Sequence, residues 1–437
     1  MRRELGPWDT TGVVIGAIIG VGIFFTPGQV AKLAGSANAA LGLWALGGLI
    51  AALGALTFAE LGRSYPRAGG QYDILRDAWG PMAAFLYVFC NLTAIQGGSI
   101  AIIAWYCAQN LAEAAGASLT NGTNLVSAVV LIAGLTFANV LGVRTGAGVQ
   151  NVTVVARLLT LGGIGAIALF APPAPVASAP AAAVPTGLAF VAGVLPAMFA
   201  YGGWQQALWV GGEVKDAERN LPRAIVLGVA VVIVAYVGTA WAFFRVLGFD
   251  AVAAGGALAP AAVGSVFPGI GSRVAAFAVG ISAFGVLNAQ LLTGPRLVWA
   301  LAEDGRFFAP FRTIHAKWGT PVPAILLLGA FGAALLAAAG VDGVDRLTAW
   351  VVVVDAVFFA LTGLALVRFL AQERRYTWIA VPIAFAALEF AAVAGAVASE
   401  RVRAAALTGA AWIAVAAVIY LVRFRESSNA AGRPSAP

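Results

Sequence analysis

The sequence contains few charged side chains. Only 10% of its 437 residues are Asp, Glu, Lys or Arg, whereas about 25% of an ordinary soluble domain is charged. Hydrophobic residues instead make up 61% of the chain. A composition this apolar excludes a soluble globular protein and indicates one that lies in the lipid bilayer.

Histidine and cysteine are also scarce. The only histidine is His315, and neither an H-E-x-x-H nor a G-x-S-x-G motif occurs. These absences argue against an intramembrane hydrolase or acyltransferase, and we expect no catalytic residue, metal site or cofactor. Cys90 and Cys107 fall on one predicted helix about 25 Å apart, which is beyond the reach of a disulfide.

The apolar residues gather into runs of about 20, the length that crosses a bilayer as a helix. The run 224–244 shows no alternation of polar and apolar residues, which excludes a transmembrane β-barrel. We therefore expect an all-α polytopic membrane protein with twelve spans. These spans are 10–33, 39–61, 81–108, 124–142, 151–171, 187–213, 224–245, 273–303, 322–340, 347–369, 377–398 and 404–422.

An even number of spans places both termini on one side of the membrane. Most of the 26 Lys and Arg residues fall in loops on that side, so the positive-inside rule assigns it to the cytoplasm. We expect a multi-pass protein of the cytoplasmic membrane with both termini in the cytoplasm. The net charge of +7 is scattered over these loops and forms no compact patch for a nucleic acid.

Two of the predicted spans contain helix-breaking residues. The first span reads GAIIGVGIFFTP, and the sixth contains Pro196 followed by Tyr-Gly-Gly-Trp at 201–204. Backbone groups freed at mid-membrane are tolerated only where they line a cavity or find partners. Breaks at matching places in two five-span halves are typical of the binding site of an inverted-repeat transporter. For either span alone, close packing of small residues is the alternative interpretation.

These breaks divide the chain into segments. We expect a cytoplasmic N-terminus at 1–9, a first inverted repeat at 10–171, and a second at 187–369. Two peripheral spans follow at 377–422, and a disordered cytoplasmic tail at 423–437.

Four motifs resemble the amino acid–polyamine–organocation superfamily, and most closely its L-type amino acid transporter branch. They are GAIIGVGIFFTP at 16–27, ELGRSYPRAGGQY at 60–72, FAYGGWQQALWVGGEVKDAERNLPRAI at 199–225 and the segment 284–325. The resemblance implies the leucine-transporter fold, with ten core helices in two inverted halves. It also implies sodium-independent secondary transport of amino acids.

The resemblance also implies where the substrate binds. The amino acid carboxylate would meet backbone N–H groups at Gly20, Val21 and Gly22, although many relatives have serine where this chain has Val21. The ammonium would meet carbonyls at Ile18, Ile19, Phe199, Ala200 and Gly202. Phe199 matches the aromatic gate over the site, and its alternative role is simple packing.

Two charged residues fall inside predicted spans. Arg157 in span 5 matches a lysine of sodium-independent relatives, and we expect it to replace sodium by bonding the break in span 1 and Ser282. Its alternative role is to reach the membrane surface. Asp355 in span 10 belongs to no motif of the family; it is either a proton carrier or a fixed-charge group facing the cavity.

Charged residues at the cytoplasmic helix ends form a possible inner gate, with ordinary interfacial charges as the alternative. They are Glu60, Arg63, Glu213, Lys215 and Arg219.

The sequence is also compatible with other functions. A polyamine or cationic amino acid antiporter would need an acid near the side-chain pocket, and Asp355 could supply one. An intramembrane enzyme or a receptor would need motifs that the sequence lacks. We expect a small amino acid and the lipid bilayer as partners, and no disulfide-linked subunit, because both cysteines fall in span 3. The sequence does not decide between exchange, proton symport and facilitated diffusion.

Overall fold

The computed structural model describes residues 6–64, 70–142, 147–174, 186–303, 305, 307–340 and 343–424, without the side chains of 147–156, 209–213, 296 and 300. Within these ranges every regular element is a helix and no strand occurs, which confirms the expected all-α class. Ten helical segments of the described chain are long and apolar enough to cross a membrane. The other two predicted spans are the first, which is broken, and the fifth, whose described apolar part is Arg157–Phe170.

The first six predicted spans contain two interrupted segments and one local change of helix type. Their elements are α1 (Pro7–Ile18), η1 (Gly22–Phe24), α2 (Thr26–Ala34), α3 (Ala37–Ser64), α5 (Pro81–Cys90), η2 (Asn91–Gln96), α6 (Gly97–Ala114), α7 (Asn121–Val140), α8 (Ala147–Phe170), α9 (Leu188–Val191), η3 (Ala192–Val194), α10 (Leu195–Tyr201) and η4 (Trp204–Glu213).

The last six spans consist mainly of single long helices. They are α11 (Ala217–Leu247), α14 (Ile270–Glu303), α15 (Val322–Ala339), α16 (Val344–Gln372), α17 (Ala380–Ala398), which follows the short η6 (Tyr376–Trp378), and α18 (Arg403–Arg423). Several helices begin earlier or end later than the apolar runs predict. For example, α11 starts at Ala217 rather than at 224, because its polar first turns still form helix beyond the hydrocarbon.

Four further elements occupy segments that we predicted as loops. They are α4 (Gly70–Trp79), α12 (Phe249–Ala254), α13 (Leu258–Val266) and η5 (Ala309–Arg312). Helix α4 is amphipathic: Ile74 and Leu75 are fully buried, while Arg76 pairs with Asp73 at 2.8 Å and with Asp77 at 2.9 Å. Hydropathy over a membrane-length window misses such short helices because they do not cross the bilayer.

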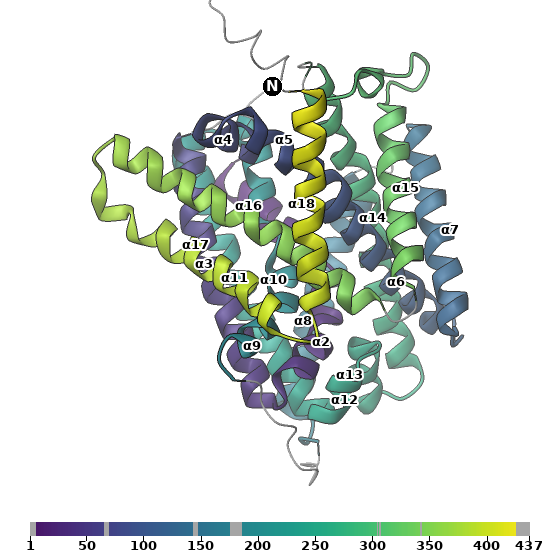
Figure 1. Cartoon of the computed structure of the whole chain (residues 1–437). Helices are drawn as coiled ribbons and strands as arrows, with labels where there is room; N and C mark the ends of the chain where they lie inside the picture. The colour runs from purple at the N-terminus through teal and green to yellow at the C-terminus, as the bar shows by residue number, and fades with distance from the viewer. Residues whose placement is uncertain are drawn as a thin grey trace, which may run out of the picture.

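The spans form one bundle with two distinct ends. Figure 1 shows the N-terminus and α4 at one end and α12 and α13 at the other. We call these the inner end and the outer end, following the orientation predicted from charge. Figure 1 also shows α16 and α17 as an antiparallel pair inclined to α18. The two broken segments meet inside the bundle, where α1 packs on η4 and α10 packs on α2.

Parts of several sequence predictions lie outside the described residues. They include residues 1–5 of the predicted cytoplasmic N-terminus, the tail beyond 424 and the side chain of Glu213. Cys90 and Cys107 are both described, and both are buried and free.

Candidate functional site

The first span is interrupted between Ile18 and Gly22. Helix α1 ends at Ile18, and the N–H of Gly20 turns back to donate to the Ile18 carbonyl at 2.7 Å. Among the described residues, the N–H groups of Val21 and Gly22 have no hydrogen-bond acceptor. The break therefore presents free donors in the interior of a membrane protein, where an unsatisfied polar group is costly.

The sixth span is interrupted at Gly202 and Gly203. Helix α10 ends at Tyr201, where the Gly202 N–H donates to the Met198 carbonyl at 3.0 Å and the carbonyls of Phe199 and Ala200 are left without helical partners. Gly203 adopts φ +124°, a conformation that residues with a Cβ rarely adopt. A Cβ at Gly203 would lie 2.5 Å from the Ala17 carbonyl oxygen, and one at Gly22 would lie 2.9 Å from the Ala200 Cα. Only glycine allows the two breaks to approach this closely.

A cavity of about 130 Å³ lies where the two breaks meet. Seven of the eight residues predicted to bind substrate line it. They are Ile18, Gly20, Val21, Gly22, Phe199, Ala200 and Gly202. Ile19 does not line the cavity, and its carbonyl accepts a hydrogen bond from Arg157 instead. The Ile18 carbonyl also has a partner in the Tyr236 hydroxyl, which donates to it at 3.1 Å.

The third span supplies polar residues that the sequence did not single out. Its helix widens to a π-helix over η2, which places Asn91 and Gln96 on the cavity wall. Such widened turns often occur at functional sites. No sequence pattern predicts a π-helical turn. The only indication that these two residues face the site was the presence of an Asn and a Gln in an apolar run.

Arg157 connects three spans at the break. Its side chain is 3% exposed and extends from α8. Its Nε donates to the Ser282 Oγ of α14 at 2.6 Å, and its Nη1 donates to the carbonyls of Ile19 and, at 3.4 Å, Gly16. A cation at the carboxyl end of α1 is also favoured by the helix dipole. Arg157 therefore makes the contacts with the break in span 1 and with Ser282 that we predicted, rather than reaching the membrane surface.

Three aromatic rings pack together beside the cavity, and one of them, Phe199, lines it. The Phe199 ring lies 5.9 Å from the ring of Phe25, which stacks on Tyr106 at 3.9 Å with an interplanar angle of 10°. Phe25 follows the first break and Tyr106 belongs to α6. We had singled out only Phe199, because a stack between rings distant in sequence exists only in the folded chain.

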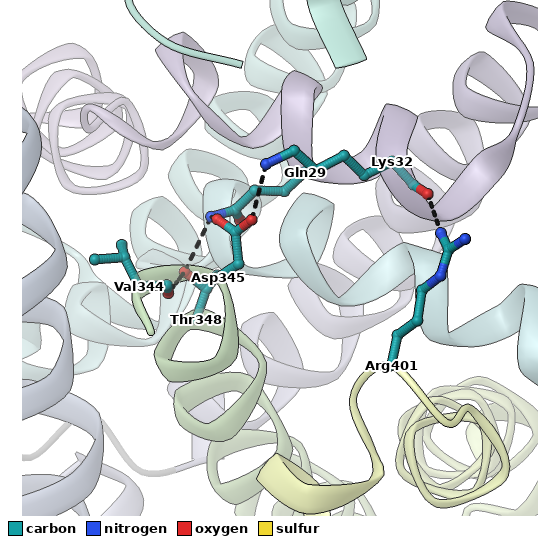
Figure 2. A network of polar contacts seen from close by, with 6 residues as sticks. All are labelled: Gln29, Lys32, Val344, Asp345, Thr348 and Arg401. Atoms are coloured by element: carbon teal, nitrogen blue, oxygen red, sulfur yellow. Dashed lines mark hydrogen bonds and ion pairs between the residues drawn. The ribbon is translucent and has the colours of Figure 1, made fainter. Parts of the chain in front are cut away.

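A polar network joins α2 to α16, and Figure 2 shows its side chains from close by. The Lys32 Nζ lies 3.0 Å from the Asp345 Oδ2, and the Gln29 Nε2 donates to the Asp345 Oδ1 at 2.7 Å. Gln29 also reaches the Thr348 hydroxyl at 3.4 Å, and Arg401 donates to the Lys32 carbonyl. We call Gln29, Lys32 and Asp345 the outer latch, because they join α2 to α16.

The predicted inner gate is only partly assembled. Glu60 accepts from Arg63 at 3.1 Å and from Arg375 at 2.7 Å, so it ties α3 to the segment after α16. The hydrogen bonds to Glu60 and Glu373 raise the pKa of Arg375 above its ordinary value. Lys215 and Arg219 are exposed and form no ion pair with another described residue. The gating role of these residues stays a prediction.

Two acids face the cavity from α16 and α17. Asp355 lines it and is half-buried, as a cavity-facing group would be. Glu389 also lines the cavity, is fully buried, and has no hydrogen-bond partner on either carboxylate oxygen among the described residues. We missed Glu389 in the sequence, where its signal was one acid in the apolar run AVPIAFAALEFAAVAGAVA.

Comparisons with known proteins give one consistent result. The family model described as amino acid permease matches residues 5–423. The serine/threonine exchanger SteT of Bacillus subtilis is 28% identical over 366 residues, covering 83% of either chain. The large neutral amino acids transporter small subunit 2 of Mus musculus is 32% identical over 75% of this chain, and Asc-type amino acid transporter 1 of Homo sapiens is 30% identical over 75%. The matched regions are 63% and 64% of these two mammalian proteins.

Proposed function

The chain belongs to the amino acid permease family, and we propose that it exchanges neutral amino acids across the cytoplasmic membrane without sodium, by alternating access. Family membership makes it a membrane transporter rather than an enzyme. The observation that carries the proposal is the cavity of about 130 Å³ at the meeting point of two broken helices. Paired breaks of this kind form the substrate site of inverted-repeat transporters.

We assign the substrate carboxylate to the free N–H groups of Val21 and Gly22, since backbone donors at a helix break suit an anion. The ammonium then meets the carbonyls of Phe199 and Ala200, in the last turn of α10. Ile18 and Ile19 contribute less, because Tyr236 and Arg157 already occupy their carbonyls. The substrate side chain then points toward Phe199, Met198 and Val352.

The size of the cavity favours a small or medium side chain. An apolar cavity of about 150 Å³ holds one benzene molecule, so about 130 Å³ accommodates one amino acid and few waters. The names of the relatives agree, since they include a serine/threonine exchanger and transporters of neutral amino acids. The polyamine or cationic alternative has less support, because two of the three relatives reported above are named for serine and threonine or for large neutral amino acids.

Orientation and partners complete the proposal. The excess of Lys and Arg at the inner end supports cytoplasmic termini. Breaks in the first and sixth spans support the division into repeats at 10–171 and 187–369. Because Cys90 and Cys107 are both buried, we propose that the transporter works without a disulfide-linked subunit.

The direct test is exchange in proteoliposomes. Vesicles containing the purified protein are loaded with one unlabelled neutral amino acid and given its labelled form outside in sodium-free buffer. We expect labelled substrate to accumulate faster when its unlabelled form is inside. A requirement for sodium, or exchange confined to lysine, arginine or polyamines, would contradict the proposal.

The outer latch is expected to restrain opening of the cavity toward the outside. Because the Lys32 and Asp345 side chains are 46% and 45% exposed, their ion pair contributes only about 0.2–1 kcal/mol. The substitution Asp345→Asn should therefore raise outward opening about 1.4- to 5-fold. The readout is the rate at which an impermeant thiol reagent labels a cysteine placed at the cavity residue Ser99. The native cysteines are buried and give little background.

Asp250→Asn is the matched control for the latch. Asp250 is an exposed acid on α12, at the same end of the molecule, and belongs to no ion pair with a described residue. It should leave the labelling rate unchanged. Equal rates in Asp345→Asn and in the unmodified protein would mean that the latch does not hold the outer side closed.

A further inference from the structure

Glu389 is the only acid on α17 and is sealed inside the bundle. It has no exposed surface, and neither carboxylate oxygen has a hydrogen-bond partner among the described residues. An ionised carboxylate in such a place, with neither a donor nor a counter-ion, costs several kcal/mol or more. The buried cation Arg157 is engaged with α1 and α14 instead. Binding a proton would remove the negative charge of Glu389 and with it the free-energy cost of burying that charge.

Asp355 is the titratable group that shares this environment. The two carboxyl groups line the same cavity and come from helices α16 and α17, which pack against each other. Asp355 also interacts with the buried phenol of Tyr87, and it has no hydrogen bond or ion pair to a described residue. Two neighbouring carboxylates repel each other, so such a pair tends to keep at least one proton.

Other charged groups on the elements packed against α17 lie toward helix ends. Helices α3, α16 and α18 carry Glu60, Arg63, Asp345, Arg346, Arg368, Arg403 and Arg423 at such positions, while α9, η3 and η6 carry no charged residue. Glu60 is already paired with Arg63 and Arg375, and Asp345 with Lys32. None of these groups is among the residues that line the cavity. The pair is therefore without a resident counter-ion among the described residues.

The geometry distinguishes a proton from a larger cation. Asp355 is half-buried and lines the cavity, whereas Glu389 lines the same cavity but is fully buried. A substrate ammonium or guanidinium could touch Asp355 in this conformation but not the oxygens of Glu389. A proton, by contrast, can pass from the cavity through one carboxyl group to the other.

We propose that Asp355 and Glu389 form a carboxyl pair that binds a proton from the central cavity and links proton movement to amino acid transport. The pair holds the proton while the cavity is closed. When the cavity opens, water reaches the pair, stabilises the second carboxylate and allows the proton to leave. This inference rests on the proposed function, because it assigns the coupling ion to the same cavity.

The test measures protons and amino acid in the same vesicles. Proteoliposomes with the full chain carry a pH-sensitive dye inside, are voltage-clamped with potassium and valinomycin, and receive an inward gradient of the neutral amino acid identified by exchange. We expect the lumen to acidify by about one proton per amino acid, since one carboxyl group takes up one proton. Glu389→Gln should lower this ratio about tenfold or more, because an amide cannot take up a proton.

Two further variants make the result specific. Asp355→Asn should lower the ratio in the same way as Glu389→Gln. Glu400→Gln makes the same chemical change at an exposed position just beyond α17 and should keep the ratio of the unmodified protein. A ratio that falls in the first two variants and not in the third supports the carboxyl pair.

Each other outcome overturns the proposal in a recognisable way. If the unmodified protein exchanges neutral amino acids with no luminal acidification, the pair does not couple protons, although the proposed function stands. If lysine or arginine enters without protons, and both pair variants stop that entry, the pair is a subsite for a cationic side chain. An unmodified protein that moves no amino acid would overturn the proposed function and this inference together.

Discussion

Replacing Arg157 with alanine should lower amino acid exchange about 100-fold or more. The substitution removes a buried guanidinium that bonds Ser282 and the carbonyls of Gly16 and Ile19. Each carbonyl left without a donor costs about 1–3 kcal/mol, and every 1.4 kcal/mol corresponds to about tenfold. The break in span 1 then loses the contact that fixes it against α14. The measurement is exchange in sodium-free proteoliposomes, normalised to the amount of reconstituted protein.

Two further variants help to interpret the result for Arg157→Ala. Arg157→Lys keeps the charge, but its single ammonium cannot reproduce the spread of guanidinium hydrogen bonds, so we expect a smaller loss of about tenfold. Arg423→Ala removes an exposed arginine at the end of α18 and should leave exchange unchanged. Normal exchange by Arg157→Ala would exclude the idea that this side chain takes the place of sodium. Restoration of the alanine variant by added sodium would support it strongly.

Replacing Gly203 with alanine should lower exchange about 30-fold or more. At φ +124° a side chain is strained by about 1–3 kcal/mol, and the added methyl would lie 2.5 Å from the Ala17 carbonyl oxygen. Because that neighbour is backbone, relief requires the two broken segments to move apart. Such a shift displaces both the donors after Ile18 and the carbonyls of α10. Initial exchange rates at saturating and at low substrate would show the loss in both kcat and kcat/KM.

Gly162→Ala is the matched control for this prediction. Gly162 lies in α8 with no atom within 4 Å of a Cβ built on it, and alanine favours helix by up to about 1 kcal/mol over glycine. This variant should therefore exchange normally. Normal exchange by Gly203→Ala as well would mean that close approach of the two breaks is unnecessary for transport.

The sequence indicated the position of some residues of the site but not of others. Gly20, Gly22 and Gly202 stood out because glycine pairs interrupt long apolar runs, and seven of the eight predicted binding residues line the cavity. Glu389, Asn91 and Gln96 also line it, but a single polar residue in an apolar run does not say which way it faces. A helix has many possible rotations about its axis, and only packing selects one.

The outer latch also could not be predicted from the sequence. Lys32 and Asp345 are more than 300 residues apart, and their contact depends on how α2 meets α16. Phe25 and Tyr106 stack for a similar reason. No local pattern predicts a contact between side chains so distant in the chain, whereas Arg157 could be placed because the family motif fixed its neighbours in advance.

The sequence by itself determined that this protein is a helical membrane transporter with interrupted first and sixth spans. In hydrocarbon, a single apolar run can satisfy its backbone hydrogen bonds internally only as a helix. The length of the apolar runs therefore predicts the spans, and helix-breaking residues predict where a span is interrupted. Only the tertiary structure decided that the Ile18 carbonyl accepts a hydrogen bond from the Tyr236 hydroxyl, and that Glu389 lines the same cavity as Asp355. Those relations depend on the rotation and depth of whole helices, which are set by close packing among all the spans rather than by any one of them.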